Sequence, residues 1–189
     1  MPTPKASRET VLAAAYKQWQ KDHPGKPLPE MFLVGTRAYF EKTMGGPGND
    51  RGIYDDAIHV VSSLHFSGFQ ANTDPSVFRP GLASLLPGCH LYRPGNHGIS
   101  KPGGGYPAFR PATPGEELPV RRDGEATVPS KRPGVAIDIH RGGRNGTSSL
   151  GCQTIHPDQW DAFYALVHLA MRQAKQTTFY YILIEGPIN

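Results

Sequence analysis

Apolar residues recur at helical spacing near the N-terminus of this 189-residue chain. The positions that share one face of a helix are Val11, Leu12, Ala15, Tyr16 and Trp19. This spacing predicts an amphipathic helix from Ser7 to Asp22. Ser7 is placed to cap the first turn, and the sequence "HPGKPLP" that follows is typical of a helix stop.

The segment after that stop predicts a second helix over residues 30–43. Its candidate packing residues are Phe32, Leu33, Tyr39 and Phe40. The run "GGPGNDRG" at 45–52 then favours a loop or linker, because glycine and proline interrupt regular structure. We therefore expect an N-terminal helical segment over residues 1–48 and a separate domain over residues 49–189.

From residue 53 the pattern changes to short apolar runs separated by Gly, Pro, Asn and Asp, which is typical of strands and turns. The run "VAIDIH" alternates strictly, so Val135, Ile137 and Ile139 are predicted to share one face of a strand. Asp138 and His140 are then predicted to share the opposite face.

Residues 101–119 are rich in glycine and proline and predict surface loops. Two aromatic residues, Tyr106 and Phe109, lie within this segment. A loop that covers a substrate and a loop that is anchored by its aromatic side chains would both carry such residues. The sequence leaves both interpretations open.

The C-terminal part predicts one helix and one strand. Pro157 and Asp158 suit the first turn of a helix, which is predicted to run to about Ala174. Its apolar stripe consists of Trp160, Phe163, Tyr164, Val167 and Met171. The run "TTFYYILIEG" predicts a buried closing strand over residues 178–185. The expected fold class is mostly β (α+β), with helices before and after the central sheet.

Composition and charge narrow the classes of function. The net charge is +4, from 20 Lys and Arg against 16 Asp and Glu, and no block of basic residues stands out. A nucleic-acid partner is therefore not expected. No apolar run reaches membrane-spanning length, so we expect no stable membrane insertion. The N-terminus lacks the pattern of a secretory signal, which predicts synthesis in the cytoplasm.

One histidine and one cysteine carry the candidate chemistry. His140 ends the alternating run, and Cys152 follows twelve residues later, after a loop of small residues. An imidazole can accept the proton of a thiol or hold a thiolate as an ion pair, so this pair suits nucleophilic catalysis. Gly151 permits close approach of a substrate, and the backbone amides of Gly151 and Cys152 are candidate donors to an oxyanion. A buried structural cysteine is the competing interpretation.

The segment "IDIHRGG…TSSLGCQTI" resembles the signature of the YkuD-type L,D-transpeptidases, in which a strand ends in histidine and a loop leads to a Ser-x-Gly-Cys motif. The resemblance implies a YkuD-like β-sandwich catalytic domain followed by a helix and a strand. It also implies that Cys152 is the nucleophile, His140 the base, and Ser149 and Gly151 the motif residues. The implied substrates are peptidoglycan stem peptides, with no cofactor and no metal.

Further residues are expected to bind the substrate or orient the site. The family carries an arginine close after its cysteine, where this chain has Gln153, and a glycine after its histidine, where this chain has Arg141. His97, in the loop-like sequence "GNHGIS", is a candidate for binding substrate or orienting His140, and Asp138 is a candidate for holding polar groups near the site. A turn residue and a structural aspartate are the competing interpretations of these two.

The expected reaction begins with a thioester acyl-enzyme, which an amine resolves by transpeptidation and water resolves by hydrolysis. The chain also resembles phage and prophage proteins, which favours a lysis protein that acts at the bacterial cell wall after release or delivery. Two alternatives stay open. A metal-dependent wall peptidase would use His97, His140 and Cys152 as ligands. An inactive wall-binding or virion structural module would have kept the fold after losing activity.

Overall fold

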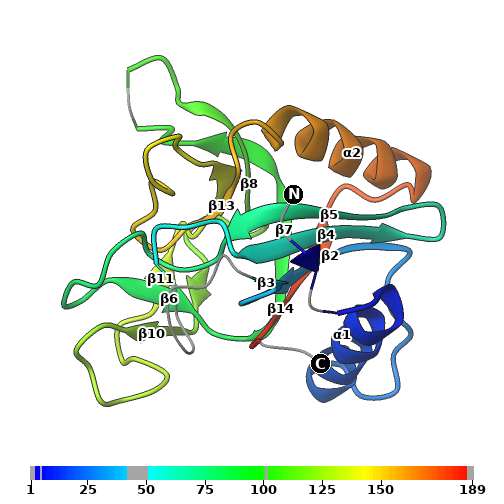
Figure 1. Ribbon diagram of the computed structural model, residues 1–189, viewed down its shortest axis with the longest axis horizontal. Coiled ribbons are helices and arrows are strands. Elements are labelled where there is room, and N and C mark those ends of the chain that lie inside the picture. The colour runs from blue at the N-terminus through cyan, green and yellow to red at the C-terminus, as the bar shows by residue number, and fades with distance from the viewer. Residues whose placement is uncertain (1–2, 5, 42–50, 101, 187–189) are drawn as a thin grey trace.

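The computed structural model describes residues 3–4, 6–41, 51–100 and 102–186. Eight strands form one closed barrel, and Figure 1 shows the strands crossing the centre of the molecule. In the order in which they are hydrogen-bonded, they are β12 (Ile139–Arg141), β13 (Gln153–Ile155), β5 (Phe66–Asn72), β4 (Asp56–Ser62), β2 (Met31–Thr36), β14 (Phe179–Ile184), β7 (Gly88–His97) and β8 (Tyr106–Pro111). Pairing of β8 with β12 closes the barrel.

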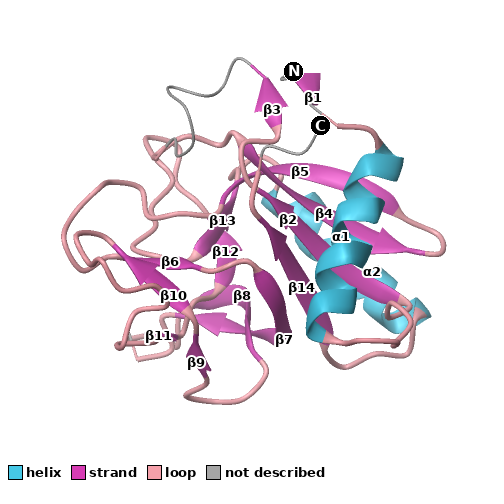
Figure 2. Cartoon of the chain, turned by 90° about the horizontal axis from the view of Figure 1, so that it is seen from below, coloured by secondary structure: helices cyan, strands magenta, loops and turns pink. Residues whose placement is uncertain are grey.

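Three short strand pairs lie outside the barrel. They are β1 (Thr3–Pro4) with β3 (Phe40–Glu41), β6 (Ala83–Leu85) with β10 (Val120–Arg122), and β9 (Glu117–Leu118) with β11 (Gly134–Val135). The last two pairs lie beside β12 and β13, as Figure 2 shows, and supply the walls of the site described below. The prediction of a mostly β fold is confirmed.

Two helices cover opposite faces of the sheet around β2 and β14 (Figure 2). Helix α1 (Arg8–Asp22) packs on one face together with Phe32 and Val34 of β2, and helix α2 (Trp160–Gln173) packs on the other face with Met31 and Leu33. Successive residues of β2 thus enter two different hydrophobic clusters. A central strand buried on both faces favours a continuous apolar run, which Met31 to Val34 supply.

The predicted helices and strand at both ends of the chain are confirmed, but Tyr16, predicted to lie in the apolar stripe of the first helix, is exposed. Helix α1 begins directly after Ser7, whose hydroxyl oxygen accepts a hydrogen bond from the Thr10 amide at 3.2 Å. Helix α2 and strand β14 fall within the predicted ranges 157–174 and 178–185. The apolar stripe of α2 is buried as expected, with Tyr164 packed at its edge.

The predicted second helix over residues 30–43 is wrong. Residues 31–36 form β2, which pairs parallel with β14 and antiparallel with β4. Residues 42–43 of the predicted helix and residues 45–50 of the predicted linker lie outside the described residues. Strand β2, from before the predicted boundary at 48, is hydrogen-bonded on both sides to strands from after it.

The predicted loop over residues 101–119 is wrong for its middle part. Residues 106–111 form β8, which pairs with β7 along its whole length. The sequence did not predict this strand because Pro107 and Pro111 have no backbone N–H to donate a hydrogen bond to a neighbouring strand. The structure also closes the strands into a barrel, where two facing sheets were expected.

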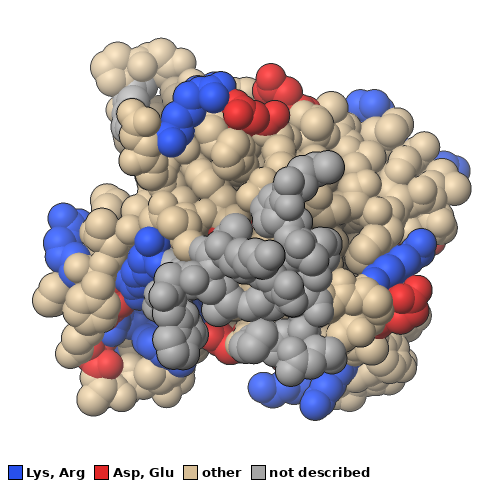
Figure 3. Space-filling view, viewed as in Figure 1, with Lys and Arg blue, Asp and Glu red and all other residues tan. Residues whose placement is uncertain are grey.

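Acidic and basic side chains are interspersed on the face that Figure 3 shows, in keeping with the mixed charge pattern of the sequence. Within the described part of the chain, neither helix has the length and apolar character needed to cross a membrane.

Candidate active site

Two parallel strands place the candidate nucleophile beside the candidate base. Strands β12 and β13 pair in parallel, with Ile139 opposite Gln153 and His140 opposite Thr154. Cys152 directly precedes β13, and the loop that joins the strands begins directly after Arg141. Residues separated by twelve positions in sequence are therefore neighbours at the same edge of the barrel.

His140, Cys152 and His97 form one cluster. One ring nitrogen of each histidine and the sulfur of Cys152 all lie within 4.8 Å of one another. The rings of His97 and His140 stack, with their centroids 4.1 Å apart and their planes inclined by 24°. His97, at the end of β7, is bonded through Nδ1 to Oδ2 of Asp138 at 2.9 Å. The sequence-predicted residues His97, Asp138, His140 and Cys152 are thus brought together.

The hydrogen bonds of His140 fix which of its nitrogens can act as a base. Nδ1 lies 2.8 Å from the carbonyl oxygen of Arg141 and 3.1 Å from the hydroxyl of Tyr106. A carbonyl oxygen only accepts, so Nδ1 must carry the proton. The lone pair is then on Nε2, which is the tautomer that a base for the Cys152 thiol requires. Tyr106, from β8, completes the aromatic wall around His140.

Burial and a carbonyl contact both favour the neutral thiol form of Cys152. Burial raises the pKa of the Cys152 thiol to about 12, and the negative charge of Asp138 raises it further. A hydrogen bond from the Asp138 backbone and the positive charge of Arg110 both lower this pKa, but by less than burial raises it. The sulfur lies 3.7 Å from the carbonyl oxygen of Ala136, in position to donate its proton there. The arrangement therefore favours transfer of the proton to His140 during attack over a preformed thiolate–imidazolium pair.

The backbone around the nucleophile is strained. Four non-glycine residues in the described part of the chain have positive φ, and two of them, Ala136 and Ser148, flank Cys152 in space or in sequence. Gly151 has φ of +147°, and a Cβ atom there would lie 2.6 Å from the carbonyl oxygen of Ala83. Only glycine fits this position without a shift of the neighbouring backbone. Such strained residues often mark functional sites.

Ser149 stabilises the loop that carries Cys152 through hydrogen bonds. Its hydroxyl donates to the carbonyl oxygen of Cys152 at 2.6 Å and accepts from the Gly151 amide at 3.0 Å. Its own amide donates to Ser76 Oγ at 2.7 Å. Ser149 is buried, so the structure gives it a positioning role rather than a substrate contact. Because the Gly151 amide is engaged in this way, the Cys152 amide is the better candidate for an oxyanion donor.

Gln153 is likewise buried and has a structural role. The side chain is 0% exposed, and its Oε1 accepts from the Tyr181 hydroxyl at 2.9 Å. Its Nε2 donates to the carbonyl oxygens of Gly151 and Thr73, each at 3.3 Å. The structure therefore places Gln153 behind the nucleophile, between β13, β14 and the end of β5, where it does not face the clefts.

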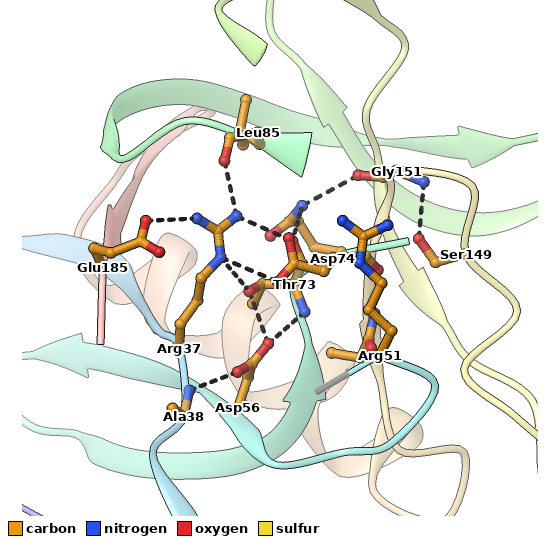
Figure 4. A network of polar contacts seen from close by, with 12 residues as sticks. Arg37, Ala38, Arg51, Asp56, Thr73, Asp74, Leu85, Ser149, Gly151 and Glu185 are labelled. Carbon is orange, nitrogen blue, oxygen red and sulfur yellow. Dashed lines mark hydrogen bonds and ion pairs between the residues drawn. The ribbon is translucent and has the colours of Figure 1, made fainter. Parts of the chain in front are cut away.

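A network of polar contacts extends from Gln153 across the barrel (Figure 4). Arg37 donates to the carbonyl oxygens of Thr73 and Leu85, at 3.3 and 2.8 Å, and forms ion pairs with Asp74 and Glu185. Asp56 accepts from the Thr73 amide and hydroxyl at 2.7 and 2.8 Å and from the Ala38 amide at 2.7 Å. Sequence reasoning missed this network, because its partners are 17 to 148 positions apart in the chain.

Two open clefts flank the nucleophile. One has a volume of about 280 Å³; Cys152 and Gly151 lie in its lining, and Leu150 and Val135 stand exposed at 65% and 56%. The other has a volume of about 360 Å³ and is lined in part by Arg93, Arg110 and Glu116. Val135 and Ala136 line both clefts and separate them.

The remaining candidates have peripheral or unexpected positions. The side chain of Arg141 is exposed, while its carbonyl oxygen holds His140. Tyr106 belongs to the site, but it lies on strand β8 and not on the predicted loop that would cover a substrate or be anchored by its aromatic residues. Phe109 is buried in the core. Arg110, one position before the end of β8, was not predicted; its Nε lies 3.5 Å from Oδ1 of Asp138. No sequence signal pointed to Arg110.

No protein-family model, curated protein or solved structure matches this chain. The geometry of the site and the sequence signature are therefore the two grounds on which a function is argued.

Proposed function

We propose that this protein is a cysteine-dependent peptidoglycan enzyme with a YkuD-like catalytic domain, acting on stem peptides through a thioester acyl-enzyme. The observation that carries the proposal is the convergence of His140 and Cys152, with Nδ1 of His140 held by a carbonyl oxygen. The resemblance of residues 136–156 to the L,D-transpeptidase signature supplies the substrate class. Bacteriolytic action as a phage lysis protein is the biological role that we attach to this activity.

In the proposed reaction, Nε2 of His140 accepts the thiol proton as Cys152 Sγ attacks the carbonyl carbon of a stem-peptide bond. The C–S bond forms and the C–N bond breaks, and the imidazolium gives its proton to the departing amine. The Cys152 amide donates to the oxyanion of the tetrahedral intermediate. Water then releases a shortened peptide, or an amine from a second stem peptide forms a cross-link, and the thiol is restored.

His97, Asp138 and Tyr106 serve as positioning residues in this proposal. Asp138 holds His97, whose ring stacks on His140, and Tyr106 contacts Nδ1 of His140. The stack restricts rotation of the His140 ring and so fixes the position of Nε2. Fixed orientation of a catalytic group lowers the entropic part of the barrier.

Mass spectrometry of purified peptidoglycan fragments tests the proposal. The native protein is expected to shorten or join stem peptides, and Cys152→Ala is expected to lower the rate at least about 1000-fold. Cys89→Ala is the matched control, since it removes the other thiol, on β7, and should leave the rate unchanged. Equal product from the native protein and Cys152→Ala would contradict a cysteine mechanism.

Two further experiments distinguish the cysteine enzyme from a metal-dependent peptidase and from a wall-binding module. A metal-dependent peptidase would lose its activity in a chelator, whereas the proposed enzyme keeps it. A wall-binding module would sediment with intact peptidoglycan and change no fragment, in both the native protein and Cys152→Ala. Either outcome replaces the proposal with the corresponding alternative.

A further inference from the structure

The three groups around Cys152 have the composition of a metal-binding site. The thiol of Cys152 and the imidazoles of His97 and His140 are all common zinc ligands. They come from three separate segments, namely the end of β7, strand β12 and the loop before β13, and their ligand atoms lie within 4.8 Å of one another. The convergence of three such groups, rather than any one of them, is the feature to be explained.

The surroundings of both histidines match those of metal ligands. A ligating histidine usually donates its second ring N–H to a carboxylate or a backbone carbonyl oxygen, which fixes its orientation. His97 Nδ1 is bonded to the carboxylate of Asp138 at 2.9 Å, and His140 Nδ1 to the carbonyl oxygen of Arg141 at 2.8 Å. In both rings the supported nitrogen is Nδ1, so Nε2 is the nitrogen that would bind an ion. This second observation is independent of the cysteine.

We propose that His97, His140 and Cys152 form a binding site for one zinc ion, and that the bound ion masks the Cys152 thiol. Zinc binding itself requires only these three side chains. Its consequence for catalysis, reversible inhibition, rests on the proposed function, because a sulfur bound to zinc is not available to attack a carbonyl carbon.

Binding requires only a small rearrangement. Zinc lies 2.0–2.1 Å from nitrogen and about 2.3 Å from sulfur, which puts tetrahedral ligand atoms roughly 3.3–3.7 Å apart. The largest separation in the cluster must therefore shorten by about 1 Å, and one of the stacked rings must tilt so that both lone pairs meet the ion. The His97 side chain is 26% exposed and has room for that tilt, whereas His140 is buried.

The donor set selects the kind of ion. Two imidazoles and a thiolate suit zinc and other borderline or soft cations, whereas magnesium and calcium prefer oxygen ligands. The nearest carboxylate, that of Asp138, is engaged by His97 and Arg110 and is not arranged as a base for a metal-bound water. The site therefore fits an inhibitory ion better than a catalytic one.

Calorimetry with zinc chloride tests the site directly in protein freed of metal by dialysis against a chelator. One ion is expected per chain, with micromolar or tighter affinity, in the native protein and in the control Cys89→Ala. Cys152→Ser and His97→Ala should each bind at least about tenfold more weakly, and Asp138→Asn about 10–100-fold more weakly, through loss of its support for His97. Thermal melting of each variant verifies that it is folded.

Cobalt substitution reports the sulfur ligand without any activity assay. A near-ultraviolet charge-transfer band is expected with the native protein and with Cys89→Ala, and its absence is expected with Cys152→Ser. In parallel, one equivalent of zinc should slow alkylation of Cys152 by iodoacetamide at least about tenfold, leave Cys89 unaffected, and be ineffective in His97→Ala. Magnesium should give no protection.

Equal zinc affinity in the native protein and in folded Cys152→Ser would overturn the inference, as would equal protection of both cysteines. Stimulation of peptide release by zinc would overturn its inhibitory part. The two proposals fail separately: absent zinc binding leaves the cysteine mechanism intact, and absent peptidoglycan products leave the zinc site intact.

Discussion

The chemistry of Cys152 depends on the proton of His140. With Nδ1–H held by the carbonyl oxygen of Arg141, Nε2 is free of its proton and can accept one from the thiol. Burial raises the pKa of the thiol to about 12, which disfavours the thiolate form at neutral pH. In the proposed mechanism, attack therefore requires a bound carbonyl group that meets the thiol and the base together.

Gly151 is the residue at which a minimal change should have the largest effect. In Gly151→Ala the new Cβ meets the carbonyl oxygen of Ala83 at 2.6 Å, so the loop that carries Cys152 must shift. We expect a loss of activity of about 100-fold or more, with a loss of about 2 kcal/mol in the free energy of unfolding. Rates of peptide release and urea unfolding measure the two effects.

The matched control is Gly146→Ala in the same loop. Gly146 has nearly the same φ, +146°, but nothing lies within 4 Å of the position that a Cβ atom would take there. It should suffer the backbone strain alone, about 1 kcal/mol, and keep most of its activity. Equal losses in the two variants would show that the contact with Ala83 does not position the nucleophile.

At the level of elements, the network around Arg37 joins the β2–β3 turn to β14, to the segment after β5 and to β6. Its guanidinium is buried and faces Asp74 and Glu185, and it donates to two backbone carbonyl groups. The carbonyl group of Thr73 is shared between Arg37 and Gln153, so the network reaches the back of the nucleophile loop. Rigid elements on either side of the site are thus linked through polar contacts (Figure 4).

Arg37→Met should destabilise the protein strongly, because it removes the buried positive charge that faces Asp74 and the donor to the Leu85 carbonyl group. We expect a loss of about 3 kcal/mol in the free energy of unfolding. Arg144→Met is the matched control: Arg144 is paired with Asp158 at 2.6 Å, but both side chains are well exposed, and such pairs contribute less than about 1 kcal/mol. Comparable losses in urea unfolding would contradict the structural role of Arg37.

The elements differ in how far the sequence reveals them. Helices with one apolar face, 8–22 and 160–173, were predictable because a single stripe meets a single neighbour. Strand β2 was not, since a short, continuously apolar run buried on both faces has no period that separates strand from helix. The pair His140 and Cys152 was predictable from its local signature. Arg37, Arg110 and the role of Tyr106 depend on contacts between distant segments, which no local pattern encodes.

At the scale of the whole molecule, the closed barrel brings the ends of the chain together. Strand β14 pairs with β2, nearly 150 residues earlier, and β8 pairs with both β7 and β12 to complete the ring. These long-range pairings deliver His97, Tyr106 and His140 to one place from three neighbouring strands. They also bury histidines in the wall of the barrel, and these make stability depend on pH.

The contribution of the buried histidines to stability should fall as the solution is acidified through pH 6.5, while Asp56, whose pKa burial raises to about 6, acts in the opposite direction. Burial lowers the pKa of His59 to about 4 and lowers that of His90 in the same direction. Above pH 6.5 His59 is neutral in both the folded and the unfolded chain, and its contribution to the free energy of unfolding is at its maximum. As the pH falls toward 4, His59 binds a proton in the unfolded chain but stays neutral in the folded chain, so the folded state loses stability. From pH 7.5 to 5 we expect His59 alone to cost about 2 kcal/mol in the free energy of unfolding.

Urea unfolding over this pH range measures the effect. His59→Leu should remove the loss that belongs to His59, and the opposing parts that belong to His90 and Asp56 should remain. An unchanged slope in His59→Leu would contradict the assignment.

The central claim is that Cys152 forms a covalent acyl-enzyme with a stem peptide, and intact-protein mass spectrometry tests it most directly. After brief mixing with stem peptides and an acid quench, the native protein should gain the mass of the acyl fragment. Peptide mapping should locate that mass on Cys152, and hydroxylamine should remove it, as expected for a thioester. Release of products with no adduct on the native protein, or an adduct that persists in Cys152→Ala, would contradict the claim.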